Sequence, residues 1–169
     1  MNVFAYDRTA AVDYARRWAF DRNPRYYDFS PVGGDCTSFV SQCLYAGCGV
    51  MNYSPVYGWY YISAGQRTAS WSSAGYLYHF LTDNTSVGPF GTAFGPLQTT
   101  DTAPTAVLPG DVVQLRNEQG SYYHSLLVVD VTDGMRVAGH SIDVWNRPLA
   151  LYTAATAVRY IHIGGYRNW

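Results

Sequence analysis

The chain has no lysine and only one glutamate, Glu118. Charged residues make up 14% of its 169 residues, against a usual share of about 25%, and the formal net charge is −1. Because this balance provides no basic surface, a nucleic-acid partner is not expected. No hydrophobic run approaches the roughly 20 residues of a membrane-spanning helix, so the sequence predicts no membrane span.

Cysteine is also scarce, with three residues at Cys36, Cys43 and Cys48. The odd number and the lack of Cys-x-x-Cys pairs give no disulfide framework and no structural zinc site. We expect Cys43 and Cys48 to be packing residues, because free cysteines are among the most buried side chains.

Two enzyme classes are disfavoured by the sequence. A zinc amidase is disfavoured because the motif His-Glu-x-x-His is missing, and a glycosidase because the one glutamate, Glu118, lies in a polar turn. We expect no metal and no cofactor.

The N-terminal segment does not show the charged-then-apolar pattern of a signal peptide. We therefore expect a cytoplasmic protein, or one domain taken from a secreted or cell-wall protein. The length is that of a single domain over residues 1–169, and we expect a monomer.

Aromatic residues are abundant, at 17% of the chain with 16 Tyr and 5 Trp. Such amphipathic rings favour surfaces that are apolar and wet at once, as in a cleft for peptide or sugar. We expect the aromatic run 57–61 and the segment 83–108 to shape the substrate cleft, with Trp59 and Tyr61 facing the substrate.

The pattern of hydrophobic residues predicts helices in the first half of the chain and antiparallel strands in the second. The predicted helices cover 8–20, 36–46 and 72–82, with Asp7 as N-cap of the first. The predicted strands cover 111–116, 122–131, 136–140 and 158–163, with a hairpin turn at Asp133-Gly134. Residues 83–108, rich in Thr, Pro and Gly, are interpreted as a long surface loop. This order of elements indicates an α+β fold.

Cys36 carries the strongest functional signal in the sequence. It follows Gly33-Gly34-Asp35 and begins an amphipathic helix, so its thiol lies on the first helical turn. The free backbone N–H groups and the dipole at that position favour a thiolate, which is the nucleophile of cysteine hydrolases. Asp35 is interpreted as a structural residue, since an aspartate before a helix is usually a cap.

A thiolate nucleophile needs an imidazole partner, which is in turn oriented by a third group. His124 and His140 lie on the two strands of the predicted hairpin, both toward the end away from the turn. We therefore predict a triad of Cys36, His124 and a polar third member. The residues leave His140 and Asp143 open as that third member.

These motifs resemble those of the bacterial "putative amidase domain" family, a relative of the NlpC-type and CHAP peptidases in the papain-like superfamily. The matching segments recur in the expected order over essentially the whole chain: Asn23-Pro24-x-Tyr26, Gly33-Gly34-Asp35-Cys36-Thr37-Ser38, Trp71-Ser72, residues 108–114, Tyr123-His124-Ser125 and Gly139-His140-Ser141-x-Asp143. The resemblance implies a papain-like fold, in which the Cys36 helix packs on an antiparallel sheet bearing His124. It also implies metal-free hydrolysis of an amide bond in peptidoglycan peptide, with His140 as the third member.

The papain branch carries a glutamine shortly before the cysteine as an oxyanion donor, and this chain has none there. We expect the backbone N–H of Cys36 and a side chain such as Tyr26 or Tyr27 to bind the oxyanion instead, with Asp35 and Thr37 lining the same region.

Two other functions stay open. The aromatic content also fits a non-catalytic module that binds carbohydrate or peptidoglycan, in which Cys36 is inert. A thiol acyltransferase or lipid amidase on the same scaffold would share the thioester chemistry and differ only in its acceptor and pocket.

Overall fold

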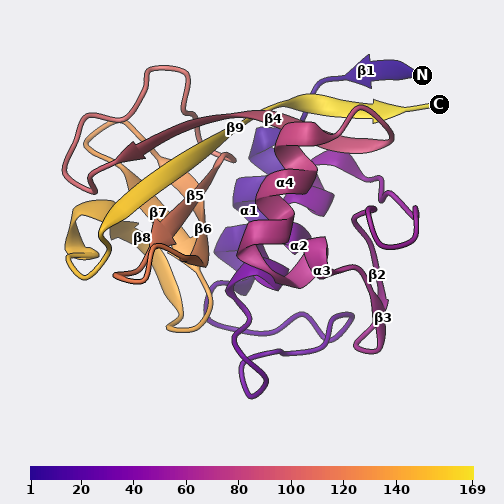
Figure 1. Ribbon diagram of the computed structural model, residues 1–169, viewed down its shortest axis with the longest axis horizontal. Coiled ribbons are helices and arrows are strands. Elements are labelled where there is room, and N and C mark those ends of the chain that lie inside the picture. The colour runs from indigo at the N-terminus through magenta and orange to yellow at the C-terminus, as the bar shows by residue number, and fades with distance from the viewer.

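A computed structural model describes residues 1–169 and has a mixed α+β architecture, with helices against one face of an antiparallel sheet (Figure 1). The helices are α1 (Arg8–Trp18), α2 (Cys36–Cys48), α3 (Ala69–Ser72), α4 (Ala74–Asp83) and the 3₁₀ turn η1 (Leu149–Leu151). The strands are β1 (Asn2–Phe4), β2 (Tyr61–Ser63), β3 (Gln66–Arg67), β4 (Gly88–Leu97), β5 (Val112–Arg116), β6 (Tyr122–Asp130), β7 (Arg136–Gly139), β8 (Val144–Pro148) and β9 (Ala157–Asn168).

The main sheet has seven strands, all paired antiparallel. Its order is β1-β9-β5-β6-β7-β8, and β4 pairs with the long strand β9. The hairpin β2–β3 forms a separate small sheet beside the helices. The α+β prediction is therefore confirmed, and the strands predicted around 112–163 are all present.

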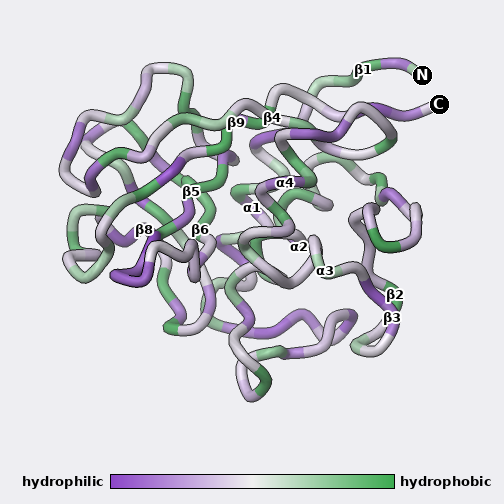
Figure 2. Tube along the Cα trace, in the orientation of Figure 1, coloured by the Kyte–Doolittle hydropathy of each residue, from purple (hydrophilic) through white to green (hydrophobic).

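Helices α1 and α2 begin at the predicted residues, Arg8 and Cys36, and α4 begins two residues after its predicted start, whereas the short helix α3 was not predicted. Asp7 caps α1 by accepting a hydrogen bond from the N–H of Ala10 at 2.9 Å. Two buried clusters join helices to sheet: Val40 and Leu44 of α2 pack with Val112 and Ile161, and Phe39 packs with Leu127. Figure 2 shows hydrophobic parts of the tube at β5 and in β9. No helix has both the length and the apolar composition needed to cross a membrane.

The opposite face of the sheet has its own core, which the sequence did not predict. Val113, Leu115 and Leu126 pack there against Val107 and Leu149, from segments that connect the strands. The sheet is therefore covered on both faces, which explains why β5 and most of β6 are hydrophobic on successive residues.

The interpretation of 83–108 as a surface loop is wrong, because β4 occupies its centre. Its glycines and prolines argued against a strand. However, Gly91 allows close pairing with β9, since a Cβ at this position would lie 2.5 Å from the carbonyl oxygen of His162. Prolines are tolerated because β4 pairs on one side only, with β9.

One irregularity in β6 lies close to the candidate site. His124 pairs with Leu115 and Tyr122 pairs with Arg116, so Tyr123 is an extra, unpaired residue, a β-bulge. Beyond the bulge the strand is regular, with Ser125 opposite Gln114. The bulge determines which face of the sheet each side chain at this end of β6 occupies.

Candidate active site

Cys36 is the first residue of α2, a helix of 13 residues. Its side chain is 8% exposed and lines a pocket of about 340 Å³. The pocket walls include Phe29, Gly33, Thr37, Tyr122 and Tyr123. The Cys36 Sγ lies 3.8 Å from the Thr37 hydroxyl. The thiol is mostly buried, but it borders this pocket and lies on the first helical turn, where backbone N–H groups have no intrahelical partner.

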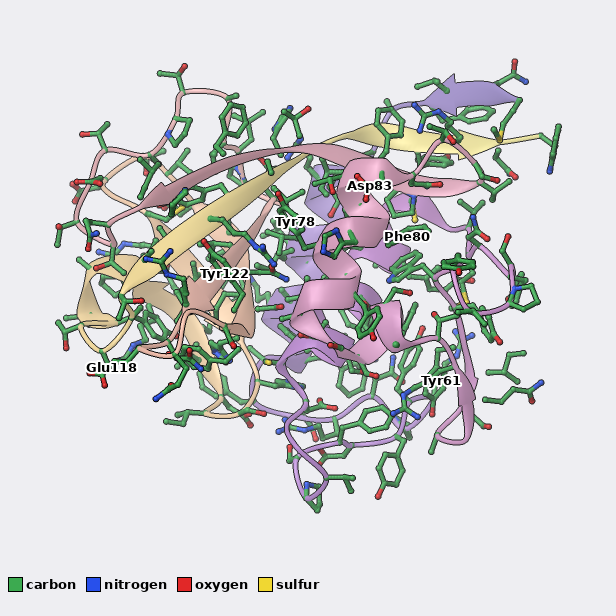
Figure 3. The ribbon with its side chains drawn as sticks, in the orientation of Figure 1. Tyr61, Tyr78, Phe80, Asp83, Glu118 and Tyr122 are labelled. Atoms are coloured by element: carbon green, nitrogen blue, oxygen red, sulfur yellow. The ribbon has the colours of Figure 1, made fainter.

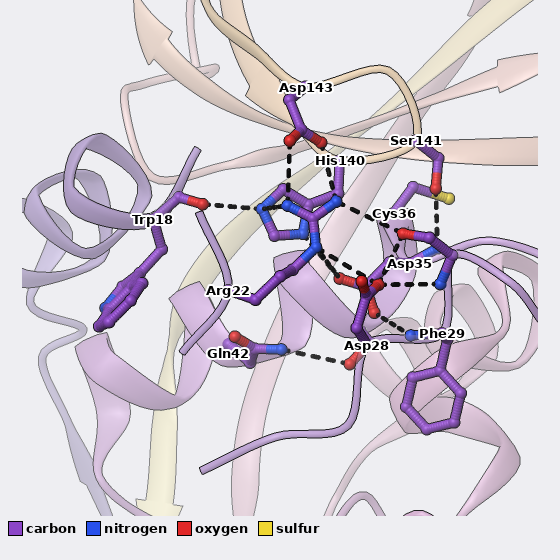
Figure 4. A network of polar contacts seen from close by, with 12 residues as sticks. Trp18, Arg22, Asp28, Phe29, Asp35, Cys36, Gln42, His140, Ser141 and Asp143 are labelled. Atoms are coloured by element: carbon purple, nitrogen blue, oxygen red, sulfur yellow. Dashed lines mark hydrogen bonds and ion pairs between the residues drawn. The ribbon is translucent and has the colours of Figure 1, made fainter. Parts of the chain in front are cut away.

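Asp35 anchors the loop that leads into Cys36 (Figure 4). Its buried carboxylate accepts hydrogen bonds from the N–H of Phe29 at 2.8 Å and from Nδ1 of His140 at 2.6 Å. Its own N–H donates to the hydroxyl of Ser141 at 2.8 Å. The side chain of Asp35 makes no capping bond and does not line the pocket of Cys36, so both predictions for it need correction: its structural role comes from these loop contacts.

Both ring nitrogens of His140 are engaged away from His124. Nδ1 meets Asp35, and Nε2 lies 2.8 Å from the carbonyl oxygen of Trp18. The ring is buried and stacks on Phe39 with 4.0 Å between ring centroids. The structure therefore does not place His140 where it would orient His124, and shows it instead as a partner of Asp35.

Arg22 joins this network from the segment after α1, and the sequence analysis did not find it. Its guanidinium makes two 3.0 Å hydrogen bonds to Asp143 and lies 3.3 Å from a carboxylate oxygen of Asp28. A third carboxylate, that of Asp35, is 3.8 Å away. Asp143, the alternative third member of the triad, is thus paired with Arg22 (Figure 4).

A buried chain of polar side chains runs beneath the pocket from Thr37 into the sheet. The Thr37 hydroxyl lies 2.9 Å from that of Ser125, which accepts from the Gln114 amide at 3.1 Å. Gln114 accepts in turn from Arg159 Nε at 2.8 Å. The Arg159 guanidinium lies between the rings of Tyr78 and Tyr122, labelled in Figure 3, at 3.6 and 3.7 Å from their centroids. This chain forms the floor of the site in the register that the structure shows.

His124 lies on the sheet face that α2 does not cover. It shares a second pocket, of about 290 Å³, with Tyr152, Ser141 and Tyr123, while Ser125 occupies the face toward α2. The structure therefore does not bring His124 into contact with Cys36. The two residues are still neighbours at one end of the sheet, because Tyr123 lines both pockets and Ser141 bonds Asp35.

Burial lowers the pKa of His124 to about 4, which makes folding stability depend on pH. In the unfolded chain the pKa is about 6.5, so between these values the unfolded state binds more protons and stability falls as pH falls. We expect the free energy of unfolding, measured with urea, to fall between pH 7 and pH 5 by about 2 kcal/mol more in the wild type than in His124→Gln. The exposed His79→Gln variant is the control, and an identical pH slope in the wild type and His124→Gln would contradict the placement.

Neither tyrosine predicted as an oxyanion donor lines the pocket of Cys36. Tyr26 stacks on Trp71 with 5.8 Å between ring centroids, and burial raises its pKa to about 12. Tyr27 is exposed and packs edge-on against Phe29. The tyrosines at the pocket are Tyr122 and Tyr123, and the sequence indicated Tyr122 only as a strand residue and Tyr123 only as part of a family motif.

The predicted substrate-contacting aromatics also require correction. Trp59 has no exposed surface; it packs against Trp71 and donates from Nε1 to the Ser41 hydroxyl at 3.0 Å. Trp59 is therefore a core residue. The prediction was wrong because an aromatic run in a sequence does not reveal which of its rings face inward. Tyr61 lies on the β2–β3 hairpin, packs on Tyr26 and borders a different pocket from that of Cys36.

The fold and site together define an α+β domain with a pocket-lining cysteine on the first turn of a helix that packs on an antiparallel sheet. Residues 5–163 match the family model described as "Putative amidase domain". The chain belongs to this family, whose description suggests hydrolysis of amides.

The chain is also similar to YhbB, an uncharacterized protein of Bacillus subtilis (strain 168), at 33% identity over 130 residues. The match covers 75% of this chain and 38% of that protein. No solved structure matches the chain.

Proposed function

We propose that the protein is a cysteine hydrolase that cleaves an amide bond in peptidoglycan peptide, with Cys36 as nucleophile. The observation that carries this proposal is the position of the Cys36 thiol, on the first turn of α2 and on the wall of an open pocket. The family description supports amide hydrolysis. The papain-like relationship, with NlpC-type and CHAP peptidases as relatives, belongs to the same proposal and rests on the order of the motifs.

A binding module without catalysis is less well supported by this arrangement. Several aromatic side chains that would form its surface, above all Trp59 and Trp71, are fully buried.

A thiol acyltransferase or lipid amidase is also less well supported. The pocket of Cys36 has walls of Thr, Ser and Tyr hydroxyls, which suit a polar peptide better than an acyl chain.

His124 is proposed as the acid–base partner of Cys36, reached by a shift of the β-bulge in β6. If the extra residue moves from Tyr123 to Ser125, His124 pairs with Gln114 on the face that α2 covers, and Ser125 gives up its hydrogen bonds with Thr37 and Gln114. The pairs Arg116–Tyr122 and Val113–Leu126 are unchanged by this shift. Tyr123, which borders both pockets, then takes the place that His124 leaves. Bulges next to active sites re-aim side chains in this way.

The proposed reaction then follows the chemistry of thiol hydrolases. The Cys36 thiolate attacks the amide carbonyl, and the oxyanion is bound by the N–H groups at the start of α2. The C–N bond breaks as His124 passes a proton to the leaving nitrogen, which leaves a thioester on Sγ. Water attacks the thioester, the acid is released, and the proton returns to the Cys36–His124 pair. Asp35, through Phe29 and Ser141, positions the loop before the nucleophile.

The test is the pH dependence of Cys36 alkylation by iodoacetamide, read by mass spectrometry. An ordinary thiol with a pKa of about 8.5 reacts about 80-fold more slowly at pH 6 than at pH 8. We expect Cys36 to react at pH 6 within about threefold of its rate at pH 8. The buried Cys43 and Cys48 serve as internal controls, because burial raises the pKa of both thiols.

The same experiment on His124→Ala and His140→Ala distinguishes the two imidazoles. Loss of the fast reaction at pH 6 in His124→Ala alone supports the shifted bulge and the Cys36–His124 pair. Loss in His140→Ala alone would assign activation to the Asp35–His140 contact and remove His124 from the mechanism. Labelling of Cys36 only above about pH 8 in the wild type would overturn the cysteine hydrolase itself.

A further inference from the structure

We infer that Arg67 binds a carboxylate of the substrate beside Cys36, so that the enzyme prefers amides of acidic peptides. The inference rests on the proposed function and names its substrate class. Arg67 ends β3 and lines the same pocket as Cys36, Gly33 and Gly34. It is the one charged side chain on a wall that otherwise consists of Cys36 and of glycine, alanine, valine, hydroxyl and aromatic residues.

The guanidinium of Arg67 is held in place before any ligand arrives. It lies over the ring of Phe29, 4.3 Å from the centroid, and Nε donates to the Ser72 hydroxyl at 3.0 Å. Nη1 donates to the carbonyl oxygen of Ala64. Nη2 makes no hydrogen bond and is accessible to solvent. A fixed guanidinium with a free, accessible edge is preorganised to bind a carboxylate.

No carboxylate of the protein competes for this edge. Arg67 forms no ion pair, and no Asp or Glu lines the pocket. The acidic residue nearest to Cys36 in the sequence, Asp35, is already bonded to Phe29 and His140. The contrast with Arg22, which contacts three aspartates, indicates that Arg67 keeps its charge available for a ligand. An acidic group next to the scissile amide is the chemistry that this pocket would recognise.

The test compares two alkylating reagents at Cys36, anionic iodoacetate and neutral iodoacetamide, which share the same leaving group. We define the ratio as the iodoacetate rate divided by the iodoacetamide rate. We expect this ratio to be at least about tenfold higher in the wild type than in Arg67→Gln, which is the size of one charge-assisted contact. The iodoacetamide rate itself should change less than threefold. Arg25→Gln, which removes an equal charge at an exposed site outside this pocket, is the matched control and should keep the wild-type ratio.

The outcomes separate the inference from the proposed function. Normal labelling by iodoacetamide with equal ratios in the wild type and Arg67→Gln overturns the carboxylate site alone. Cys36 labelled by neither reagent at pH 6 removes the nucleophile, and the carboxylate site with it. If Arg67→Gln does not fold, the ratio of the iodoacetate rate to the iodoacetamide rate is measured in the wild type at increasing salt concentration. A ratio that falls with salt supports the carboxylate site, and a constant ratio overturns it.

Discussion

Replacing Cys36 with serine is expected to reduce the release of new amino groups from peptidoglycan peptides by at least about 10³-fold. A serine hydroxyl at the start of α2 stays protonated at neutral pH, so the thioester route is closed. The change in volume is small and the site lies at a pocket wall, so thermal unfolding should be nearly unchanged. The measurement is the rate of amine release, with products identified by mass spectrometry.

Cys48→Ala is the matched control for this result. Cys48 is the last residue of α2 and is buried, so its loss should lower stability while activity per folded molecule is retained. Activity in Cys36→Ser above a tenth of the wild-type rate would assign the nucleophile to another residue. Wild-type protein that cleaves simple amides but no wall peptide would leave the hydrolase in place and remove peptidoglycan as its substrate.

Replacing Asp35 with alanine is expected to destabilise the fold by about 3–5 kcal/mol. The side chain is 1% exposed and joins the N–H of Phe29 to His140 and to the charge of Arg22. Without it, a buried imidazole and a backbone N–H lose their acceptor, and the cation keeps only Asp28 and Asp143. Urea unfolding at pH 7 measures the change.

The control is Asp83→Ala at the end of α4. Asp83 lies 3.7 Å from His79, both side chains are more than 70% exposed, and Figure 3 shows Asp83 on the outside of the helix. This change should cost less than about 1 kcal/mol, as exposed pairs usually do. If Asp35→Ala also cost less than about 1 kcal/mol, the network around Arg22 and His140 would not hold the loop before Cys36.

The parts of this fold that the sequence predicts are those governed by local chemistry. Asp7 at its cap and Gly33-Gly34 before Cys36 define two helix starts, and Asp133-Gly134 defines the β6–β7 turn. Each signal acts over a few residues. The strand β4 was missed because its pairing with β9 depends on residues about 70 positions away, which override its glycine content.

The candidate site is harder to predict, because its geometry depends on single-residue register. Alternation in β6 cannot reveal that Tyr123 is an extra residue, yet that bulge decides whether His124 or Ser125 faces α2. The partners of Asp35 and Asp143 were equally hidden: His140 lies 105 residues from Asp35, and Arg22 lies 121 from Asp143. Local patterns identified the nucleophile, and only the folded chain shows what surrounds it.

The pairing of β1 with the end of β9 has a practical consequence for attaching the domain to other molecules. Asn2 pairs with Asn168, so the two ends of the chain leave the sheet side by side, at the edge of the molecule seen at the upper right of Figure 1. A surface, a fluorophore or a second protein can therefore be joined through either end at one place. A short bridge between the ends would give a circular permutant, with new termini opened in a loop remote from the pocket of Cys36.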